Sequence, residues 1–167
     1  MRVLGIDPGT VRMGYALLLD EPIAIEEYGV LSQPRSLSLP MRLHRLHQDL
    51  MVLVDRLSPD EMALEEPFVS QDKNRRTGIA VGQAQAVGLI VAASADLLIR
   101  TYAPSTVKQA VTGYGGGSKS QVQEMVRLQL GLEEIPQPDD AADAIAVALC
   151  HLRTQETERL LSSREIG

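Results

Sequence analysis

The sequence predicts an α/β protein whose mixed five-stranded sheet is flanked by helices. Three strand-like runs follow one another in the first 31 residues, separated by short turns. After them, strand-like runs alternate with longer runs whose apolar residues recur at helical spacing. This order is typical of a sheet with both antiparallel and parallel pairs. The chain has 167 residues, of which 44% are hydrophobic, so one domain with one core is expected.

The first three predicted strands form an antiparallel meander. They comprise residues 2–7, 12–19 and 24–31, which are rich in apolar and β-branched side chains. Pro8-Gly9 breaks the first run, and Asp20-Glu21-Pro22 provides the turn between the second and the third. Connections this short return the chain antiparallel to itself, so the three strands are expected to be neighbours.

Helices and strands then alternate. Pro40 suits the first turn of a helix that ends at Ser58-Pro59, and residues 62–65 predict a short strand. The polar residues 67–76 predict a loop, and the Gly- and Ala-rich residues 77–95 predict a buried packing helix. The last elements are a strand at 97–102, helices at 104–111 and 119–130 on either side of a glycine loop, and a long helix from Asp139 onward. We expect residues 1–153 to form the domain and residues 154–167 a polar tail that frays.

The net charge of −6 is unevenly distributed. Residues 1–70 have a net charge of −5, residues 71–127 of +4 and residues 128–167 of −5. One basic band between two acidic ends suits a local anionic partner beside a site built from carboxylates. The single cysteine, Cys150, excludes an internal disulfide and is expected to be a buried small hydrophobe. The longest uncharged stretch contains two glutamines, so we predict no membrane span and a cytoplasmic protein.

Four carboxylates stand where an α/β fold gathers its chemistry. Asp7 ends the first strand, and Glu65 ends the fourth. Asp140 and Asp143 are three residues apart at the start of a helix, so they share one helical face. Because ligands of α/β proteins bind at strand ends, this helix start is placed to bring both aspartates over Asp7 and Glu65.

Clustered carboxylates repel each other unless a cation neutralises them, and hard oxygen ligands suit Mg²⁺ or Mn²⁺. Two such ions about 4 Å apart can activate a water and stabilise a leaving oxygen in phosphodiester cleavage. The four acids are therefore candidate metal ligands and catalytic groups. His44 and His47 are expected to be structural. His151, eight residues after Asp143 on the same helix, has either a structural or an active-site role.

Each carboxylate also has an ordinary structural explanation. Asp7 before Pro-Gly can cap a turn, and Glu65 can be a surface charge. Asp140 and Asp143 can serve the helix N-terminus and its dipole, a role that we assign to Asp139 as the expected N-cap. Only their joint placement indicates a shared site.

Basic side chains and one phenylalanine indicate a nucleic-acid partner. Three basic residues follow Glu65 in the polar loop, and two flank the glycine loop. Cations there can hold phosphates beside the carboxylates. Phe68 can stack on bases or wedge between them, or it can anchor its loop on the core. The candidate DNA-binding residues are Phe68, Lys73, Arg75, Arg76, Lys108 and Lys119.

With these residues in place, residues 2–152 resemble the RuvC family of Holliday-junction resolvases. Six motifs occur in the family's order, which is far more specific than any one of them. They are Gly5-Ile6-Asp7-Pro8-Gly9, Ala63-Leu64-Glu65, Gly82-Gln83-Ala84, Val107-Lys108-Gln109, Lys119-Ser120-Gln121-Val122 and Asp140-Ala141-Ala142-Asp143-Ala144.

The resemblance implies a ribonuclease-H-like fold and a metal-dependent endonuclease that resolves four-way DNA junctions in recombination and repair. It implies catalytic carboxylates at Asp7, Glu65, Asp140 and Asp143, with Lys108 and Lys119 supporting phosphate binding or transition-state charge; Lys119 is the catalytic candidate of the two. It further implies Mg²⁺, for which Mn²⁺ substitutes, with two ions per site once DNA is bound. The implied partners are a second copy of the chain, in a two-fold dimer that nicks opposite strands symmetrically, and the RuvA–RuvB branch-migration complex.

The chain also departs from the family, and three other functions stay open. Residues 103–106 lack the long basic or amide side chains of some relatives, and residues 154–167 have no counterpart. The Asp7-Pro8-Gly9-Thr10 turn also fits actin-like kinases, which need two lobes and would bind ATP. A relative of the YqgF type would act on structured RNA, but it usually lacks this lysine arrangement. A non-enzymatic junction-binding module would lack one of the four acids.

Overall fold

The computed structural model of the chain describes residues 1–67 and 75–164. Its strands are β1 (Arg2–Asp7), β2 (Arg12–Leu19), β3 (Ala24–Ser32), β4 (Glu61–Glu65) and β5 (Leu98–Tyr102). Its helices are α1 (Leu39–Leu57), α2 (Arg75–Ser94), α3 (Pro104–Thr112), α4 (Lys119–Gln129) and α5 (Asp139–Arg164). These bounds lie within one or two residues of those predicted, which is the usual uncertainty of helix and strand ends.

The strands form one mixed sheet in the order β3-β2-β1-β4-β5. The β1–β2 and β2–β3 pairs are antiparallel, as the short turns between them require. The β1–β4 and β4–β5 pairs are parallel, each reached through a helix on the α1–α2 face of the sheet. The predicted α/β class and mixed five-stranded sheet are confirmed.

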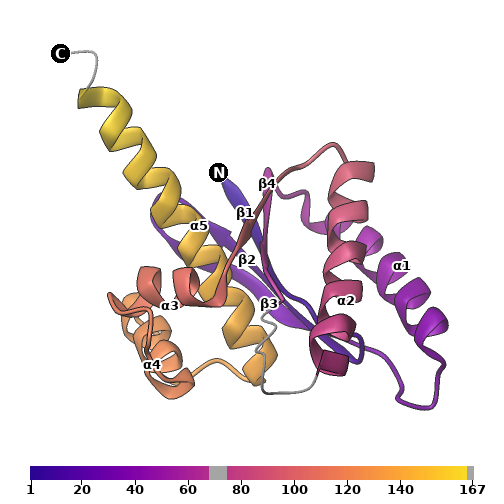
Figure 1. Ribbon diagram of the computed structural model, residues 1–167. Helices are drawn as coiled ribbons and strands as arrows, with labels where there is room; N and C mark the ends of the chain where they lie inside the picture. The colour runs from indigo at the N-terminus through magenta and orange to yellow at the C-terminus, as the bar shows by residue number, and fades with distance from the viewer. Residues whose placement is uncertain (68–74, 165–167) are drawn as a thin grey trace.

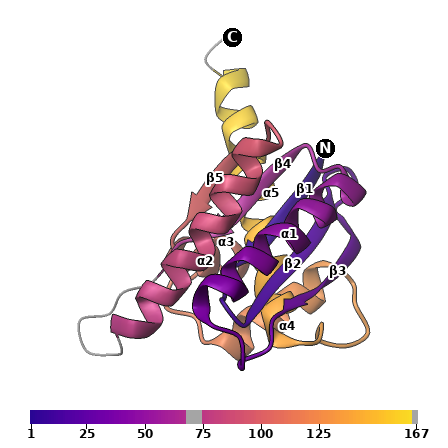
Figure 2. The same ribbon diagram turned by 90° about the vertical axis from the view of Figure 1, so that its right-hand side faces the viewer.

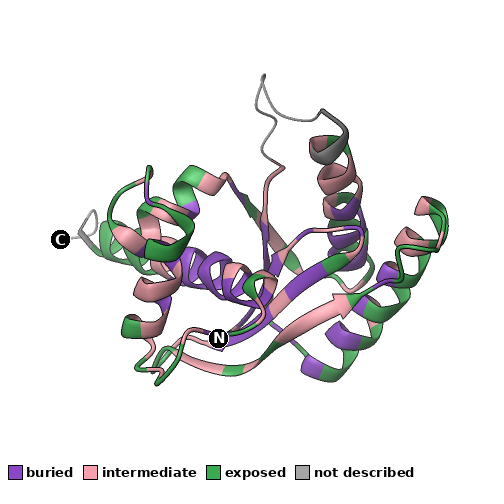
Figure 3. Ribbon diagram, turned by 90° about the horizontal axis from the view of Figure 1, so that it is seen from below, coloured by how far each residue is buried: buried purple, intermediate pink, exposed green. Residues whose placement is uncertain are grey.

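Helices cover both faces of the sheet. Helix α5, with α3 and α4 beside it, lies on one face, and α1 and α2 lie on the other (Figures 1 and 2). Alternation along the strands explains both layers, because successive side chains point to opposite faces. In β1, Val3 belongs to the core under α5, whereas Leu4 and Ile6 belong to the core under α1 and α2. The buried residues accordingly run through the centre of the molecule, along the strands and α5 (Figure 3).

Helix α5 approaches the sheet unusually closely. A Cβ on Gly5 would lie 2.3 Å from the carbonyl oxygen of Ala144, and one on Gly14 would lie 1.9 Å from that of Asp140. Only glycine fits at such distances. The first half of α5 matches this contact with a run of buried alanines. The helix start that carries Asp140 and Asp143 is thereby fixed directly over β1 and β2.

One expectation about the region after Glu65 is wrong. Helix α2 begins at Arg75, two residues before the predicted start, but it is not buried throughout. Ile79, Leu89 and Ile90 are exposed. Its small residues pack inward instead, and a Cβ on Gly88 would lie 2.5 Å from the side chain of Leu64. The uncharged residues 77–94 therefore belong to a helix with an exposed apolar face, which their composition did not indicate.

The predicted boundary at residue 154 lies within a continuous helix. Helix α5 extends to Arg164 and projects beyond the sheet (Figure 1). Arg100 Nη1 donates to Glu158 at 2.7 Å, and Arg159 Nη2 donates to Asp20 at 2.7 Å, so ion pairs tie this part of α5 to the domain. The division into a domain and a tail stays a prediction. Cys150 is buried, as expected. None of the described helices is both long and apolar enough for a membrane crossing.

Candidate active site

The four predicted carboxylates meet where β1, β4 and the start of α5 come together. Alternation places Asp7 on the same face of β1 as Val3, and Glu65 on the same face of β4 as Ala63. That face is the one that α5 covers. Parallel pairing aligns Ile6 with Leu64, which makes Asp7 and Glu65 neighbours one residue further on. The arrangement expected from the strand ends is therefore present in the fold.

Burial and mutual repulsion make two of these acids hold protons unusually tightly. Burial first, and then the charges of Asp143, Glu65 and Asp140, raise the pKa of Asp7 to about 8. Burial and the charge of Asp143 raise the pKa of Glu65 to about 7, against the opposing charges of Lys108 and Lys119. The pKa of Asp143 is also raised, mainly by burial. Because the charges of the other three carboxylates all raise the pKa of Asp7, the four acids form one electrostatic cluster.

Two cations from different elements hold the acids of α5. Lys119, at the start of α4, donates to Asp143 Oδ2 at 2.8 Å and lies 3.5 Å from Asp139. Burial lowers the pKa of Lys119, but hydrogen bonding and charge from Asp143 and Asp139 outweigh it, so the pKa is raised. Arg12, at the start of β2, donates from Nε to Asp140 Oδ2 at 2.6 Å.

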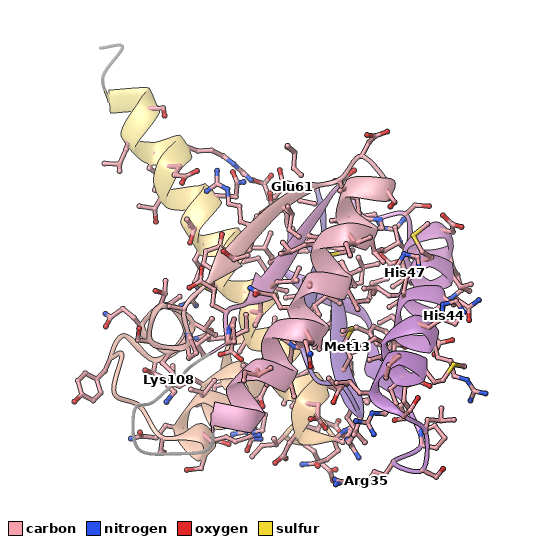
Figure 4. The ribbon with its side chains drawn as sticks, turned by 45° about the vertical axis from the view of Figure 1, so that its right-hand side comes forward. Met13, Arg35, His44, His47, Glu61 and Lys108 are labelled. Atoms are coloured by element: carbon pink, nitrogen blue, oxygen red, sulfur yellow. The ribbon has the colours of Figure 1, made fainter. Side chains whose placement is uncertain are left out.

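A cavity of about 210 Å³ opens beside the acids. Glu65 and Asp143 line it together with both predicted phosphate-binding lysines, Lys108 of α3 and Lys119 of α4. Figure 4 shows Lys108 at the side of the molecule formed by α3, well apart from the histidines of α1. The Ser118 hydroxyl and Gln121 cap the start of α4 in both directions, which fixes the end of the helix that carries Lys119.

The structure separates other predicted residues from this cluster. His151 is fully buried and lies 2.8 Å from Glu61, at the start of β4, so its active-site role is not supported. His44 and His47 lie on α1, on the opposite face of the sheet (Figure 4). Asp139 is the first helical residue of α5, one position later than expected of an N-cap. Phe68 and Lys73 lie outside the described residues. Arg75 and Arg76 begin α2, but their side chains lie outside the description.

Arg12 is the residue at this site that sequence reasoning missed. It stands outside the carboxylate and lysine motifs, and the sequence predicts it to be an ordinary strand residue. The signal was nevertheless present, because β1 and β2 form a hairpin that pairs Asp7 with Gly14. A side chain two residues before Gly14 must lie at the same end of the sheet as Asp7.

The donor set fits a hard divalent cation. All four groups are carboxylates, and at least two of them are disfavoured as anions by burial and by each other, a cost that a bound cation removes. Within residues 1–67 and 75–164, the side chains are not already gathered as three or more ligands around one point. Lys119 hydrogen-bonds to Asp143 and Arg12 to Asp140, so one oxygen of each α5 aspartate is already engaged by a cation.

A mixed sheet with acids on its two central parallel strands and on a crossing helix defines the ribonuclease-H-like class of nucleases. The family model for the crossover junction endodeoxyribonuclease RuvC matches residues 3–151. The chain belongs to the RuvC family of crossover junction endodeoxyribonucleases.

Individual relatives agree with this assignment. A crossover junction endodeoxyribonuclease of Dehalococcoides mccartyi is 46% identical over 153 residues, which cover 90% of this chain and 92% of the relative. One of Chloroflexus aggregans is 46% identical over 94% of this chain and 96% of the relative. The structure of Thermus thermophilus RuvC superimposes with a TM-score of 0.84 at 31% identity, covering 94% and 97% of the two chains. A T. thermophilus RuvC in complex with a Holliday junction substrate gives 0.81 at 30% identity, covering 93% of this chain and 96% of the other.

Proposed function

We propose that this chain resolves four-way DNA junctions by paired, symmetric, metal-dependent nicks during recombination and repair. The observation that carries the proposal is the gathering of Asp7, Glu65, Asp140 and Asp143 at one end of the sheet, with Lys108 and Lys119 on the adjoining cavity. The RuvC family assignment supplies the class of substrate. A cytoplasmic location stays a prediction from the sequence.

The side chains divide the work by position. Asp7, Glu65, Asp140 and Asp143 would hold Mg²⁺, or Mn²⁺ in its place, with two ions per site once DNA is bound. Such ions supply an activated water and stabilise the leaving oxygen of the phosphodiester. Lys119 stays protonated beside Asp143 and can donate to a phosphoryl oxygen. Lys108, which lines the same cavity, can hold a phosphate of the same strand.

The candidate DNA-binding residues after Glu65 would extend this surface. Phe68 and Lys73, with Arg75 and Arg76 at the start of α2, follow directly on the strand that ends in Glu65. This segment joins the end of β4 to the start of α2. We assign it the contacts to the centre of the junction, by stacking and by charge.

Paired nicks require two sites, which we assign to a two-fold homodimer. The exposed apolar residues Ile79, Leu89 and Ile90 on α2 support this, because a helix face of this kind is typically covered by a partner. Burial of the same patch on both copies is the usual form of a two-fold interface. A partnership with the RuvA–RuvB complex stays a prediction from the family.

The proposal is tested with a four-way junction whose homologous core lets the crossover migrate through many sequences. Each of the four strands is labelled in turn, beside a linear duplex of the same sequence, in Mg²⁺ and in EDTA. We expect nicks at matching positions of two opposite strands, in the junction alone and with metal alone. Asp7→Asn is expected to abolish cutting and to keep junction binding, because it removes a ligand and a repulsive charge.

Other outcomes would each correct a different part of the proposal. Metal-dependent cutting of both substrates would retain the nuclease and remove the junction specificity. Binding without cutting in Mg²⁺ and in Mn²⁺ would replace the enzyme with a junction-binding module. Full activity of the Asp7→Asn variant would remove Asp7 from the site.

A further inference from the structure

Arg12 is a cation beside Asp140 of the candidate site, and the carboxylate and lysine motifs do not include it. Its Nε donates to Asp140 Oδ2 at 2.6 Å, across 128 positions of sequence. Within the described part of the chain, this is the hydrogen bond that its guanidinium makes, so neither Nη group has a protein acceptor there. The side chain of Arg12 is 46% exposed, and that of Asp140 is 31% exposed.

The backbone fixes Arg12 in this place. The turn after Asp7 folds tightly against it, because a Cβ on Gly9 would lie 2.1 Å from the carbonyl oxygen of Arg12. Two residues later, Gly14 lets β2 touch the backbone of Asp140. The start of the strand that carries Arg12 is thus held both by the turn that follows Asp7 and by the helix that carries Asp140. The side chain of Arg12 can change its rotamer, whereas the backbone that carries it is closely packed.

The contact between Arg12 and Asp140 is of a kind that is readily exchanged. It is a single hydrogen bond between two partly exposed groups, and ion pairs of this sort contribute little to stability. It uses Asp140 Oδ2, one of the oxygens with which this carboxylate would ligate a cation. Arg12 and a divalent ion cannot both take the same lone pair of that oxygen.

We propose that Arg12 couples metal binding to DNA binding by exchanging Asp140 for a phosphate of the junction. In the protein without metal it neutralises Asp140 and competes with the ion. Once the ion holds Asp140, the freed guanidinium lies at the mouth of the site and binds the incoming strand. The inference rests on the proposed function, since it takes Asp140 as a metal ligand and DNA as the substrate.

The chemistry of the side chain favours a phosphate as its second partner. A guanidinium is always charged, and its planar fork matches two oxygens of a phosphate as well as it matches a carboxylate. Lys108 and Lys119 lie on the α3–α4 side of the acids, whereas Arg12 comes from β2. Arg12 would therefore add a contact on a side of the site that the two lysines do not reach.

The first arm of the test measures metal binding without DNA. Free Mn²⁺ is titrated with wild-type protein and with Arg12→Gln and Arg12→Lys variants at one fixed pH, and unbound Mn²⁺ is read by its electron paramagnetic resonance signal. Removing the positive charge that competes for Asp140 is expected to tighten Mn²⁺ binding several-fold. Arg12→Lys, which retains the charge, is expected to bind Mn²⁺ as the wild type does.

The second arm measures junction affinity against salt, in EDTA and in Ca²⁺, with gel electrophoresis confirming that the junction stays uncut. We expect Arg12→Gln to bind like the wild type in EDTA and several-fold more weakly in Ca²⁺. The dependence of log K on log salt is expected to steepen by about 1 with Ca²⁺ in the wild type but not in Arg12→Gln. Arg12→Lys, which lacks the fork, is expected to recover only part of the Ca²⁺-dependent affinity.

A matched control is available in Arg56 of α1. Its Nη1 and Nη2 donate to Glu27 of β3 at 2.7 and 2.6 Å, and the two side chains are 52% and 34% exposed, so this is a similarly exposed arginine–carboxylate pair, bidentate rather than single, far from the acids. Arg56→Gln is expected to leave both arms unchanged.

Three results would overturn the inference. Equal loss of junction affinity in EDTA and in Ca²⁺ would make Arg12 a phosphate contact independent of metal. Wild-type values in both arms for Arg12→Gln would make the pair with Asp140 merely structural. The same changes in Arg56→Gln would make them a nonspecific effect of lost charge. If instead the wild type neither binds Mn²⁺ nor cuts the junction, the proposed function fails before Arg12 is tested.

Discussion

At the scale of single residues, the candidate site works against the stability of the fold. Asp7 is an acid whose pKa in the folded protein is about 8, against 3.8 for the free group. The folded state therefore binds this proton more tightly than the unfolded state does. The stabilisation that results is fully present below the unfolded pKa and is lost as the pH rises through the folded pKa. At neutral pH and above, the cluster of acids is a cost that the rest of the molecule offsets.

Asp7→Asn is accordingly expected to stabilise the protein without metal. The amide keeps the shape of the carboxyl and carries no charge, so the variant avoids that cost. A cost of about 2 kcal/mol, after discounting for relaxation of the site, corresponds to a rise in Tm of about 4–8 °C at pH 8. The difference should become small near pH 4, where the folded wild type holds the proton and the unfolded chain is close to its own pKa of 3.8.

Thermal unfolding followed by circular dichroism from pH 4 to pH 8.5, in EDTA and in Mg²⁺, checks this. The exposed Glu133→Gln in the loop before α5 serves as the control, and we expect it to change Tm by less than about 1 °C. A Tm of Asp7→Asn at or below that of the wild type at pH 8 would show that Asp7 is not strained by its neighbours.

At the scale of the element, α5 carries two acids of the candidate site and also a buried histidine that is hydrogen-bonded to β4 and β5. Its first turn carries Asp140 and Asp143, and further along the helix His151 Nδ1 lies 2.9 Å from Tyr102 Oη. Its Nε2 lies 2.8 Å from Glu61. A carboxylate can only accept, so Nε2 carries the proton and Nδ1 accepts from Tyr102. The neutral ring thereby connects α5 to β4 and to β5.

His151 is expected to make stability fall at acid pH. Burial lowers its pKa, although the charge of Glu61 opposes the shift, so the folded protein binds this proton less tightly than the unfolded chain does. The stability that the neutral ring contributes is present above the unfolded pKa of about 6.5 and is lost as the pH falls below it. His151→Gln removes this titration but also breaks two buried hydrogen bonds, at a cost of about 2 kcal/mol at pH 8.

The difference in Tm between the wild type and His151→Gln should therefore narrow from pH 8 to pH 5. His44→Gln, an exposed histidine of α1, is the control and should follow the wild type at every pH. A difference that stays constant with pH would mean that His151 titrates in the folded protein as it does in the unfolded chain.

The elements show which parts of a fold can be predicted from one sequence. Alternation in the strands and the helical spacing of leucines are local signals, and the order of elements followed from them. The acids were found because strand ends and a helix start mark them in the sequence itself. Arg12 was missed because its partner, Asp140, is 128 positions away. Composition alone predicted a buried α2, because it does not distinguish a helix buried within its own chain from an exposed one; only the family resemblance, which puts residues 77–95 at or near a dimer interface, indicated an exposed face.

At the scale of the whole molecule, paired cleavage would need both the exposed face of α2, to join two chains, and the cluster of acids on each chain, to cut one strand. One cluster of acids can cut one strand at a time, whereas resolution of a junction needs matching cuts on two strands. The acids lie at one end of the sheet, and α2 lies on the face of the sheet opposite to α5 (Figure 2). A two-fold dimer through α2 would place two equivalent sites in fixed relation to each other.

Ile90→Glu is expected to convert a dimer of this kind into monomers. Ile90 of α2 is 55% exposed in the single chain, so a carboxylate is tolerated there by the monomer, but it would be buried without a partner in a two-fold contact. Val52→Glu is the matched control, because Val52 of α1 is 66% exposed and lies on a different helix. Analytical ultracentrifugation across protein concentrations should give a dimer for the wild type and for Val52→Glu, and a monomer for Ile90→Glu.

Cleavage gives the second readout of the same variant. With its acids intact, the monomer should still nick the junction in Mg²⁺, but the two nicks should become independent events. A supercoiled plasmid with an extruded cruciform distinguishes the cases, since paired nicks within one binding event give linear DNA and separate nicks give open circles first. Linear product from monomeric Ile90→Glu would mean that pairing of the cuts does not depend on α2. A wild type that sediments as a monomer, even with the junction bound, would place the second nick in a separate binding event.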